Sequence, residues 1–151
     1  MNLPPNALIE LWREARTRFS NQLVDLKEEE LLKRLGNSPN SAGFLIRHVA
    51  DVELLFAKNV FKLPGVEVYA KTVIAKMDTG EWNHLTELID YQQYAFDSLE
   101  RAILAQREDE WHVEISTKEF GTKTKAEALG RIISHTAYHA GQLAIVIKYG
   151  K

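Results

Sequence analysis

The sequence contains no cysteine among its 151 residues, which excludes disulfide bonds, zinc sites built from cysteine and a cysteine nucleophile. It also lacks an excess of one charge. The formal net charge of -2 offers no broad attraction for nucleic acid or for an anionic membrane. The longest apolar run, LAIVI, is far too short to span a bilayer. We therefore expect neither nucleic acid nor a membrane as a partner.

Proline and glycine are scarce, with 4 and 8 residues, while hydrophobic residues make up 45% of the chain. This composition is typical of a globular protein rather than a disordered or fibrous one. A chain of this length can bury one core, so we expect a single domain over residues 1–151. The N-terminal stretch MNLPPNALIELWREARTRF is studded with charge and does not resemble a signal peptide, which predicts a cytoplasmic protein.

Four segments repeat apolar residues at the three- and four-residue spacing of an amphipathic helix. They cover about residues 6–26, 41–61, 84–106 and 123–149. The first follows the Pro4-Pro5 pair, which suits a helix start, and Ser41 is a suitable N-cap for the second. Because no strand-forming run of comparable length remains, the pattern predicts an all-α four-helix bundle.

Two connections between these helices carry further signals. Residues 63–83 are longer than a compact bundle usually needs, and such lengths typically mark lids, binding loops or additional local structure. Between the third and fourth helices, WHVEI alternates apolar and polar residues and TKEFGT supplies a turn, so a small hairpin is predicted there. We expect Trp12, Trp82 and Trp111 to be packing residues rather than substrate contacts.

The stretch HTAYHAGQ places His135 and His139 one turn apart on the fourth helix. A third histidine, His48, lies on the second helix. On an ideal helix, His48 lies roughly 60°, His139 roughly 40° and His135 roughly 80° from the centre of the apolar stripe of its helix. All three lie at the edge of a buried face. If these two edges face each other, three imidazoles converge.

Two interpretations of these histidines stay open. They can be partly buried structural groups that hydrogen-bond to backbone or to neighbouring helices. Alternatively, three neutral imidazoles from two helices hold a divalent ion, here zinc, nickel, iron or manganese, and leave positions open for water or substrate. Ligation would satisfy one nitrogen of each ring, whereas unpartnered rings would lose hydration without compensation.

Other metal motifs are not supported. Thr136 stands where the zinc-protease helix motif needs a catalytic glutamate. Glu81 and His84 have the Glu-x-x-His spacing of di-iron bundles, but a second copy of that motif is absent. We expect His84 at a helix start on the surface and His112 facing solvent.

Three polar residues near the histidines are further candidates. Gln142, three residues after His139, can orient a ligand or bind a metal-bound water, or it can be a flanking residue hydrogen-bonded within the bundle. Asp51, close after His48, can accept the second N–H of that ring or remain a solvated helix charge. Tyr138 is expected to point outward and to line the mouth of the cleft.

Together, the segments SAGFLIRHVADVE and FGTKTKAEALGRIISHTAYHAGQL resemble the DinB/YfiT-like superfamily, and the likeness covers nearly the whole chain, including DTGEW. Its most specific part is the His-x-x-x-His-x-Gly-Gln pattern combined with the upstream histidine. The resemblance implies an up-down-down-up four-helix bundle with a divalent metal held by His48, His135 and His139. A homodimer is compatible with it, because relatives often form dimers.

Characterised members of that superfamily include transferases and isomerases that use low-molecular-weight thiols such as bacillithiol or mycothiol, with the metal activating the thiol as thiolate. The resemblance therefore implies a metal-dependent transferase that uses such a thiol on a small electrophilic substrate. We take Gln142 and Tyr138 as the candidate catalytic residues, and we expect Gln142 and the 63–83 connection to orient and cover the substrate while Tyr138 lies at the entrance. Two other functions stay open. Water in place of the thiol would make the protein a metal-dependent hydrolase. Structural histidines would make it a non-catalytic helical stress-response module.

Overall fold

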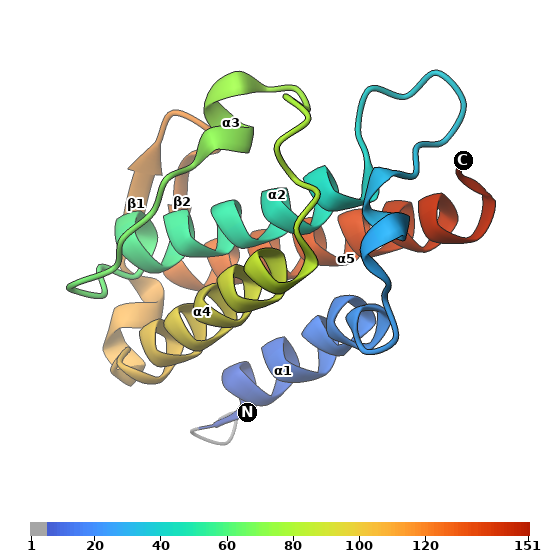
Figure 1. The fold of residues 1–151 in the computed structure, drawn as a ribbon. Coiled ribbons are helices and arrows are strands. Elements are labelled where there is room, and N and C mark those ends of the chain that lie inside the picture. The colour runs from blue at the N-terminus through green and yellow to red at the C-terminus, as the bar shows by residue number, and fades with distance from the viewer. Residues whose placement is uncertain (1–5) are drawn as a thin grey trace.

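A computed structural model describes residues 6–151, which form helices and one small hairpin (Figure 1). The helices are α1 (Ala7–Ser20), α2 (Ala42–Leu55), α3 (Lys71–Ala75), α4 (Leu85–Leu104) and α5 (Lys125–Tyr149), and the strands are β1 (Glu114–Thr117) and β2 (Gly121–Thr124). Turns of 3-10 helix cover Asn21–Leu23, Glu28–Leu32 and Glu108–His112, and a π-helical turn, Phe56–Val60, continues α2. Within residues 6–151, no helix has the length and apolar character needed to cross a membrane.

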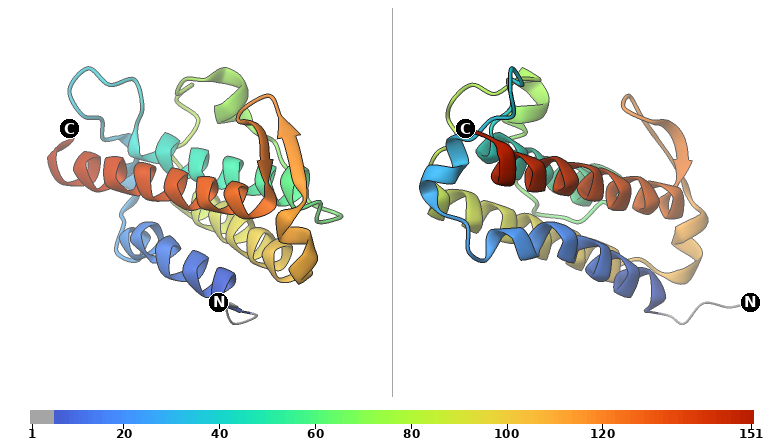
Figure 2. Two further views of the ribbon diagram at one scale, coloured as in Figure 1. Left: turned by 180° about the vertical axis from the view of Figure 1, so that it is seen from behind. Right: turned by 90° about the vertical axis from the view of Figure 1, so that its right-hand side faces the viewer.

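The long helices α1, α2, α4 and α5 pack together. Figure 1 and Figure 2 show that α1 and α5 run in one direction, and that α2 and α4 run in the opposite direction. Helix α2 contacts both α4 and α5, and α1 contacts the same two helices. The chain is therefore mainly helical, as the apolar periodicity predicted.

The N-terminal half agrees with the sequence patterns except at the end of the first helix. The Pro4-Pro5 pair lies outside the described residues. Helix α1 ends at Ser20 and continues as a 3-10 turn instead of extending to residue 26. The 63–83 connection contains local structure of its own, the short helix α3.

The predicted hairpin is present, but its first strand begins later than the alternation in WHVEI indicated. Strand β1 starts at Glu114, which pairs with Thr124 of β2. Trp111 and His112 belong to the preceding 3-10 turn. The alternation misplaced the strand start because a capping interaction, Arg107 N–H to the Glu110 carboxylate at 2.8 Å, starts a helical turn there.

Side-chain caps fix where α2 and α5 begin. The hydroxyl of Ser41 accepts a hydrogen bond from the Phe44 N–H and donates one to Asp78 at 2.6 Å, so its prediction as the N-cap is confirmed. At the start of α5, Thr124 and Glu127 cap each other's backbone N–H groups. Both helices that carry the candidate histidines therefore start at defined residues.

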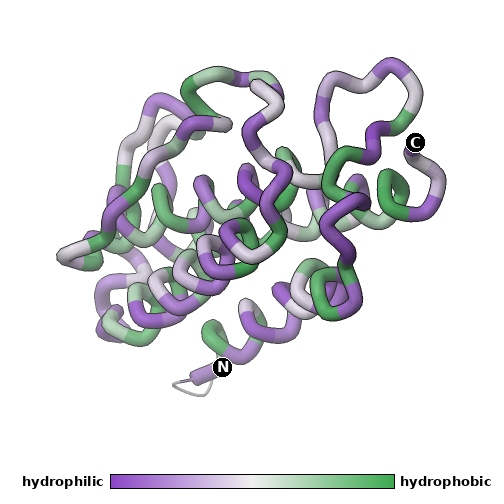
Figure 3. Tube along the Cα trace, in the orientation of Figure 1, coloured by the Kyte–Doolittle hydropathy of each residue, from purple (hydrophilic) through white to green (hydrophobic). Residues whose placement is uncertain are grey.

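Buried apolar residues form two clusters along the bundle, one beside the hairpin and one toward the end of α5. Figure 3 shows hydrophobic and hydrophilic positions alternating along the long helices. A buried polar residue separates the two clusters on each of α1, α4 and α5, namely Arg16, Gln92 and Thr136. Trp12 and Trp82 are buried, and Trp111 packs against the first cluster, so the expectation that the tryptophans pack is confirmed.

Arg16 forms an almost completely buried ion pair with Glu53 of α2. Its Nε donates to Glu53 Oε1 at 2.9 Å, and its Nη2 donates to Gln92 Oε1 at 3.0 Å. Desolvation raises the pKa of the Glu53 carboxyl, while the charge and hydrogen bond of Arg16 oppose that rise. Because removing one partner would leave a buried charge unpaired, these contacts fix the relative positions of α1, α2 and α4.

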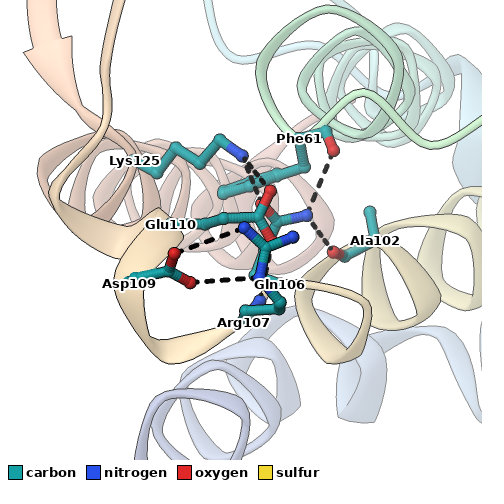
Figure 4. Close-up of polar contacts among 7 residues, drawn as sticks. All are labelled: Phe61, Ala102, Gln106, Arg107, Asp109, Glu110 and Lys125. Atoms are coloured by element: carbon teal, nitrogen blue, oxygen red, sulfur yellow. Dashed lines mark hydrogen bonds and ion pairs between the residues drawn. The ribbon is translucent and has the colours of Figure 1, made fainter.

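A second polar network joins the end of α4 to the start of α5 (Figure 4). Lys125 is only 6% exposed, and its Nζ donates to Gln106 Oε1 at 2.6 Å and lies 3.3 Å from Glu110 Oε1. The Gln106 amide in turn donates to the carbonyl oxygens of Phe61 and Ala102. The network thus holds the first turn of α5 against the ends of α2 and α4.

Gly43 is required where α2 meets the chain at Trp82. A Cβ added at Gly43 would lie 1.8 Å from the Trp82 carbonyl oxygen. We expect Gly43→Ala to lower the free energy of unfolding by about 1–3 kcal/mol, because the methyl group forces Trp82 away from α2. Chemical denaturation followed by circular dichroism measures the change.

The matched control is Gly130→Ala, on α5, where an added Cβ meets nothing within 4 Å. Alanine there is expected to raise the free energy of unfolding by about 0.5–1 kcal/mol, because it restricts the unfolded chain and favours helix. Equal changes in the two variants would contradict the close approach at Gly43.

Candidate metal centre

His48 on α2 faces His135 and His139 on α5. The ring centroids are 5.2 Å apart for His48 and His135, 4.8 Å for His48 and His139, and 4.5 Å for His135 and His139. One nitrogen of each ring lies within 4.8 Å of a nitrogen of the other two. The two helix edges therefore face each other, and the structure brings the three imidazoles together.

Hydrogen bonds place the proton on Nδ1 and the lone pair on Nε2 in two of the three rings. Nδ1 of His139 lies 2.7 Å from Gln142 Oε1, an acceptor, so Nδ1 carries the proton and Nε2 carries the lone pair. Nδ1 of His48 lies 3.2 Å from the Thr72 hydroxyl, whose own proton goes to Asp51. The same assignment therefore holds for His48.

His135 is the least satisfied of the three. Its Nε2 lies 3.2 Å from Nε2 of His48, while its buried Nδ1 has no hydrogen-bond partner within residues 6–151. Two nitrogens bound to one tetrahedral ion at about 2.0–2.1 Å lie about 3.3 Å apart. The spacing of the His48 and His135 nitrogens thus fits a shared metal ion, and the three residues could hold one.

The protein environment favours the neutral, metal-binding form of these imidazoles. Desolvation, reinforced by the charge of His139, lowers the pKa of His48 to about 4, against a smaller opposing effect of Asp51. Desolvation and the charges of His139 and His48 lower the pKa of His135 to about 3. Desolvation also lowers the pKa of His139, and its hydrogen bond to Gln142 opposes this. All three are neutral at pH 7 and need no deprotonation before ligation.

Asp51 is neither a solvated charge nor a direct partner of His48. Its side chain is fully buried and accepts hydrogen bonds from Arg47 at 2.9 Å, from the Tyr91 hydroxyl at 2.6 Å and from the Thr72 hydroxyl at 2.6 Å. Thr72 therefore lies between Asp51 and His48. Burial, followed by the hydrogen bond to Asp51, raises the pKa of Tyr91, which keeps it a donor.

One cavity borders His135, and a second lies further along α5, at Gln142. The cavity of about 320 Å³ beside His135 is lined by apolar and polar residues: Val52, Phe56, Glu119, Arg131, Ser134 and Tyr138. Tyr138 is 65% exposed and lies edge-on to the His139 ring at 5.1 Å. The second cavity, of about 150 Å³, is lined by Gln142 and mainly apolar residues. The cluster is thus accessible from the surface of α5.

Sequence reasoning placed several residues correctly and missed others. His84 and His112 are exposed, as predicted. Thr72 and Tyr91 were missed, because neither the 63–83 connection nor the periodicity of α4 gives a local sign that these hydroxyls meet at Asp51. Gln142 contacts a histidine ring, which a spacing of three residues from His139 made foreseeable.

Comparison with known proteins gives one family. A family model described as the DinB superfamily matches residues 11–143, a range that includes all three histidines. No curated protein matches the chain significantly.

The histidine cluster predicts a pH dependence of stability for the metal-free protein. Because their pKa values are lowered by folding, these imidazoles bind fewer protons in the folded than in the unfolded state. Stability is thus fully present above about pH 6.5, the unfolded value, and is expected to fall as the pH drops toward the folded values. Urea denaturation at pH 7, 5.5 and 4 measures the effect.

Replacing His48, His135 and His139 together by glutamine is expected to reduce this loss of stability at low pH. The control replaces His84 and His112, which are exposed, by glutamine and is expected to retain it. A pH profile of the triple variant that is identical to that of the unmodified protein would contradict the lowered pKa values.

Proposed function

The chain belongs to the DinB superfamily, and from this membership we propose that His48, His135 and His139 hold one divalent ion, zinc, nickel, iron or manganese. We propose further that residues 1–151 form a single domain, an up-down-down-up four-helix bundle. The protein then acts as a metal-dependent transferase that uses a low-molecular-weight thiol on a small electrophilic substrate. The convergence of three neutral imidazoles on one point is the observation that carries this proposal.

The chemistry of the chain supports a nucleophile taken from solution. The sequence has no cysteine, and the residues beside the histidines include no paired carboxylates or Ser-His-Asp arrangement. A divalent ion in a three-histidine site lowers the pKa of a thiol or a water molecule and so supplies a nucleophile at neutral pH. The sulfur forms a bond to the electrophilic carbon as the leaving group departs, and the thiol proton passes to solvent.

The cavity beside His135 provides a place for the substrates. Val52 and Phe56 offer apolar contacts, while Arg131 offers a positive charge to an anionic group. Nε of Arg131 forms an ion pair at 3.8 Å with the carboxylate of Glu119, which lines the same cavity, so an anionic ligand would compete with Glu119 for the guanidinium. Gln142 positions the His139 ring through its side-chain oxygen, and Tyr138 borders the opening of the cavity.

Metal binding is tested by elemental analysis of the protein purified without chelator. We expect one divalent ion per chain, and we expect His135→Ala combined with His139→Ala to abolish binding, because one remaining imidazole cannot hold the ion tightly. The control, His84→Ala combined with His112→Ala, should retain one ion per chain. Metal content that is unchanged in the first double variant would refute the ligand assignment.

The transferase reaction is tested with a chromogenic electrophile and the metal-loaded protein. Bacillithiol, mycothiol, glutathione and coenzyme A are each supplied as the thiol, and at least one is expected to give conjugation that disappears in the His135→Ala, His139→Ala variant. Metal-dependent ester or amide hydrolysis without any conjugation would replace the transferase by a hydrolase. If the protein binds no metal and catalyses neither conjugation nor hydrolysis, the result would favour a non-catalytic helical module.

A further inference from the structure

Thr72 lies far from the histidines in the sequence, yet its side chain contacts one of them. It belongs to α3, in the 63–83 connection, and it is 2% exposed. Its Oγ1 lies 3.2 Å from Nδ1 of His48 and 2.6 Å from Oδ2 of Asp51. The hydroxyl therefore bridges an imidazole and a buried carboxylate.

The direction of these hydrogen bonds follows from the acceptors. Carboxylate oxygens only accept, so the single hydroxyl proton of Thr72 is donated to Asp51. The lone pairs of the hydroxyl are then left for His48, whose Nδ1–H is the donor. This arrangement places the proton of His48 on Nδ1 and directs the lone pair of Nε2 at His135.

The same residues hold the connection against α2. Arg47 Nη2 donates to the Tyr69 carbonyl oxygen at 2.8 Å, and Asp51 accepts the Thr72 backbone N–H at 3.1 Å. Arg47 and Asp51 lie one turn apart on one face of α2, and the Arg47 guanidinium is stacked 3.6 Å from the centre of the Tyr91 ring. We call residues 69–76 the docked segment.

The docked segment has few apolar contacts. Ala70 is buried and Val73 packs against the first apolar cluster, but Tyr69, Lys71, Ile74 and Lys76 are exposed. A segment with few buried apolar contacts opens locally at a lower free energy than the bundle core. Docking of this segment is thus set largely by its hydrogen bonds to Arg47 and Asp51.

We propose that Thr72 is a positioning residue, and that docking of the segment selects the His48 tautomer that binds the metal. The inference rests on the proposed metal site. Because Thr72 belongs to the docked segment and contacts a ligand, metal affinity and docking are coupled. By linkage, the coupling is reciprocal: docking tightens metal binding, and the bound metal stabilises docking.

The test compares Zn²⁺ affinity in the full chain by competition with a chromophoric chelator. Thr72→Val removes the hydroxyl at nearly constant volume and is expected to weaken Zn²⁺ binding by about 10- to 100-fold, as the loss of a group that orients a ligand does. Thr72→Ser keeps the hydroxyl and should bind like the unmodified protein. The control, Thr136→Val, removes a buried hydroxyl that has no partner within residues 6–151 and should leave the affinity unchanged.

Limited trypsin digestion supplies a readout of the reciprocal effect. Lys71 and Lys76 are exposed in the docked segment, and mass spectrometry identifies cleavage after each. Saturating Zn²⁺ is expected to slow this cleavage in the unmodified protein and in Thr72→Ser, but to give less protection in Thr72→Val.

Long-range ¹⁵N nuclear magnetic resonance of the metal-free protein measures the tautomer of His48 directly. The unmodified protein should show His48 protonated on Nδ1, and Thr72→Val should show a mixture of tautomers.

The outcomes separate the two proposals. If the unmodified protein binds no Zn²⁺, the proposed metal site fails and the role of Thr72 fails with it. If the unmodified protein and Thr72→Val bind Zn²⁺ equally and are equally protected, the metal site stands and the role of Thr72 is overturned. Faster cleavage of Thr72→Val without any loss of affinity would likewise reduce Thr72 to a structural contact.

Discussion

The buried carboxylate of Asp51 is the constraint on which this structure depends. A carboxylate without water must receive hydrogen bonds from the protein, and Asp51 receives them from α2, α3 and α4 through Arg47, Thr72 and Tyr91. These contacts fix α4 and the long connection relative to α2. They also determine which atoms surround His48, which lies close to Asp51 on the same helix.

The buried ion pair of Arg16 with Glu53 and the histidine cluster differ in their access to solvent, and this difference separates a structural contact from a candidate functional site. Arg16 and Glu53 are almost completely buried, and Arg16 is paired with both Glu53 and Gln92. The three histidines are only partly buried, His135 borders a cavity, and Nδ1 of His135 has no partner within residues 6–151. Because Glu53 Oε2 also lacks a partner within residues 6–151, the distinguishing feature is the cavity: a ligand can reach the histidines, whereas the buried pair mainly fixes helix positions.

Helix α5 contributes both to the apolar core and to the histidine site, through two adjacent stripes of residues. Residues such as Leu129, Ile132 and Leu143 are buried in the apolar clusters. Arg131, His135, Tyr138 and Gln142 follow at spacings of three and four residues, so they share a neighbouring face and line the two cavities. Packing of the first stripe therefore holds the second in place.

Local signals in the sequence determined the helices, the Ser41 cap and the spacing of His135 and His139, because helical hydrogen bonds and periodicity act over three or four residues. They also placed His48 at the edge of its apolar stripe. Only the tertiary structure decided that this edge faces α5, 87 residues away, and that Thr72 reaches His48 from 24 residues away. It also decided the burial of Asp51, for which the sequence favoured a solvated helix charge. Such contacts depend on how helices and connections pack, and no short-range pattern encodes that packing.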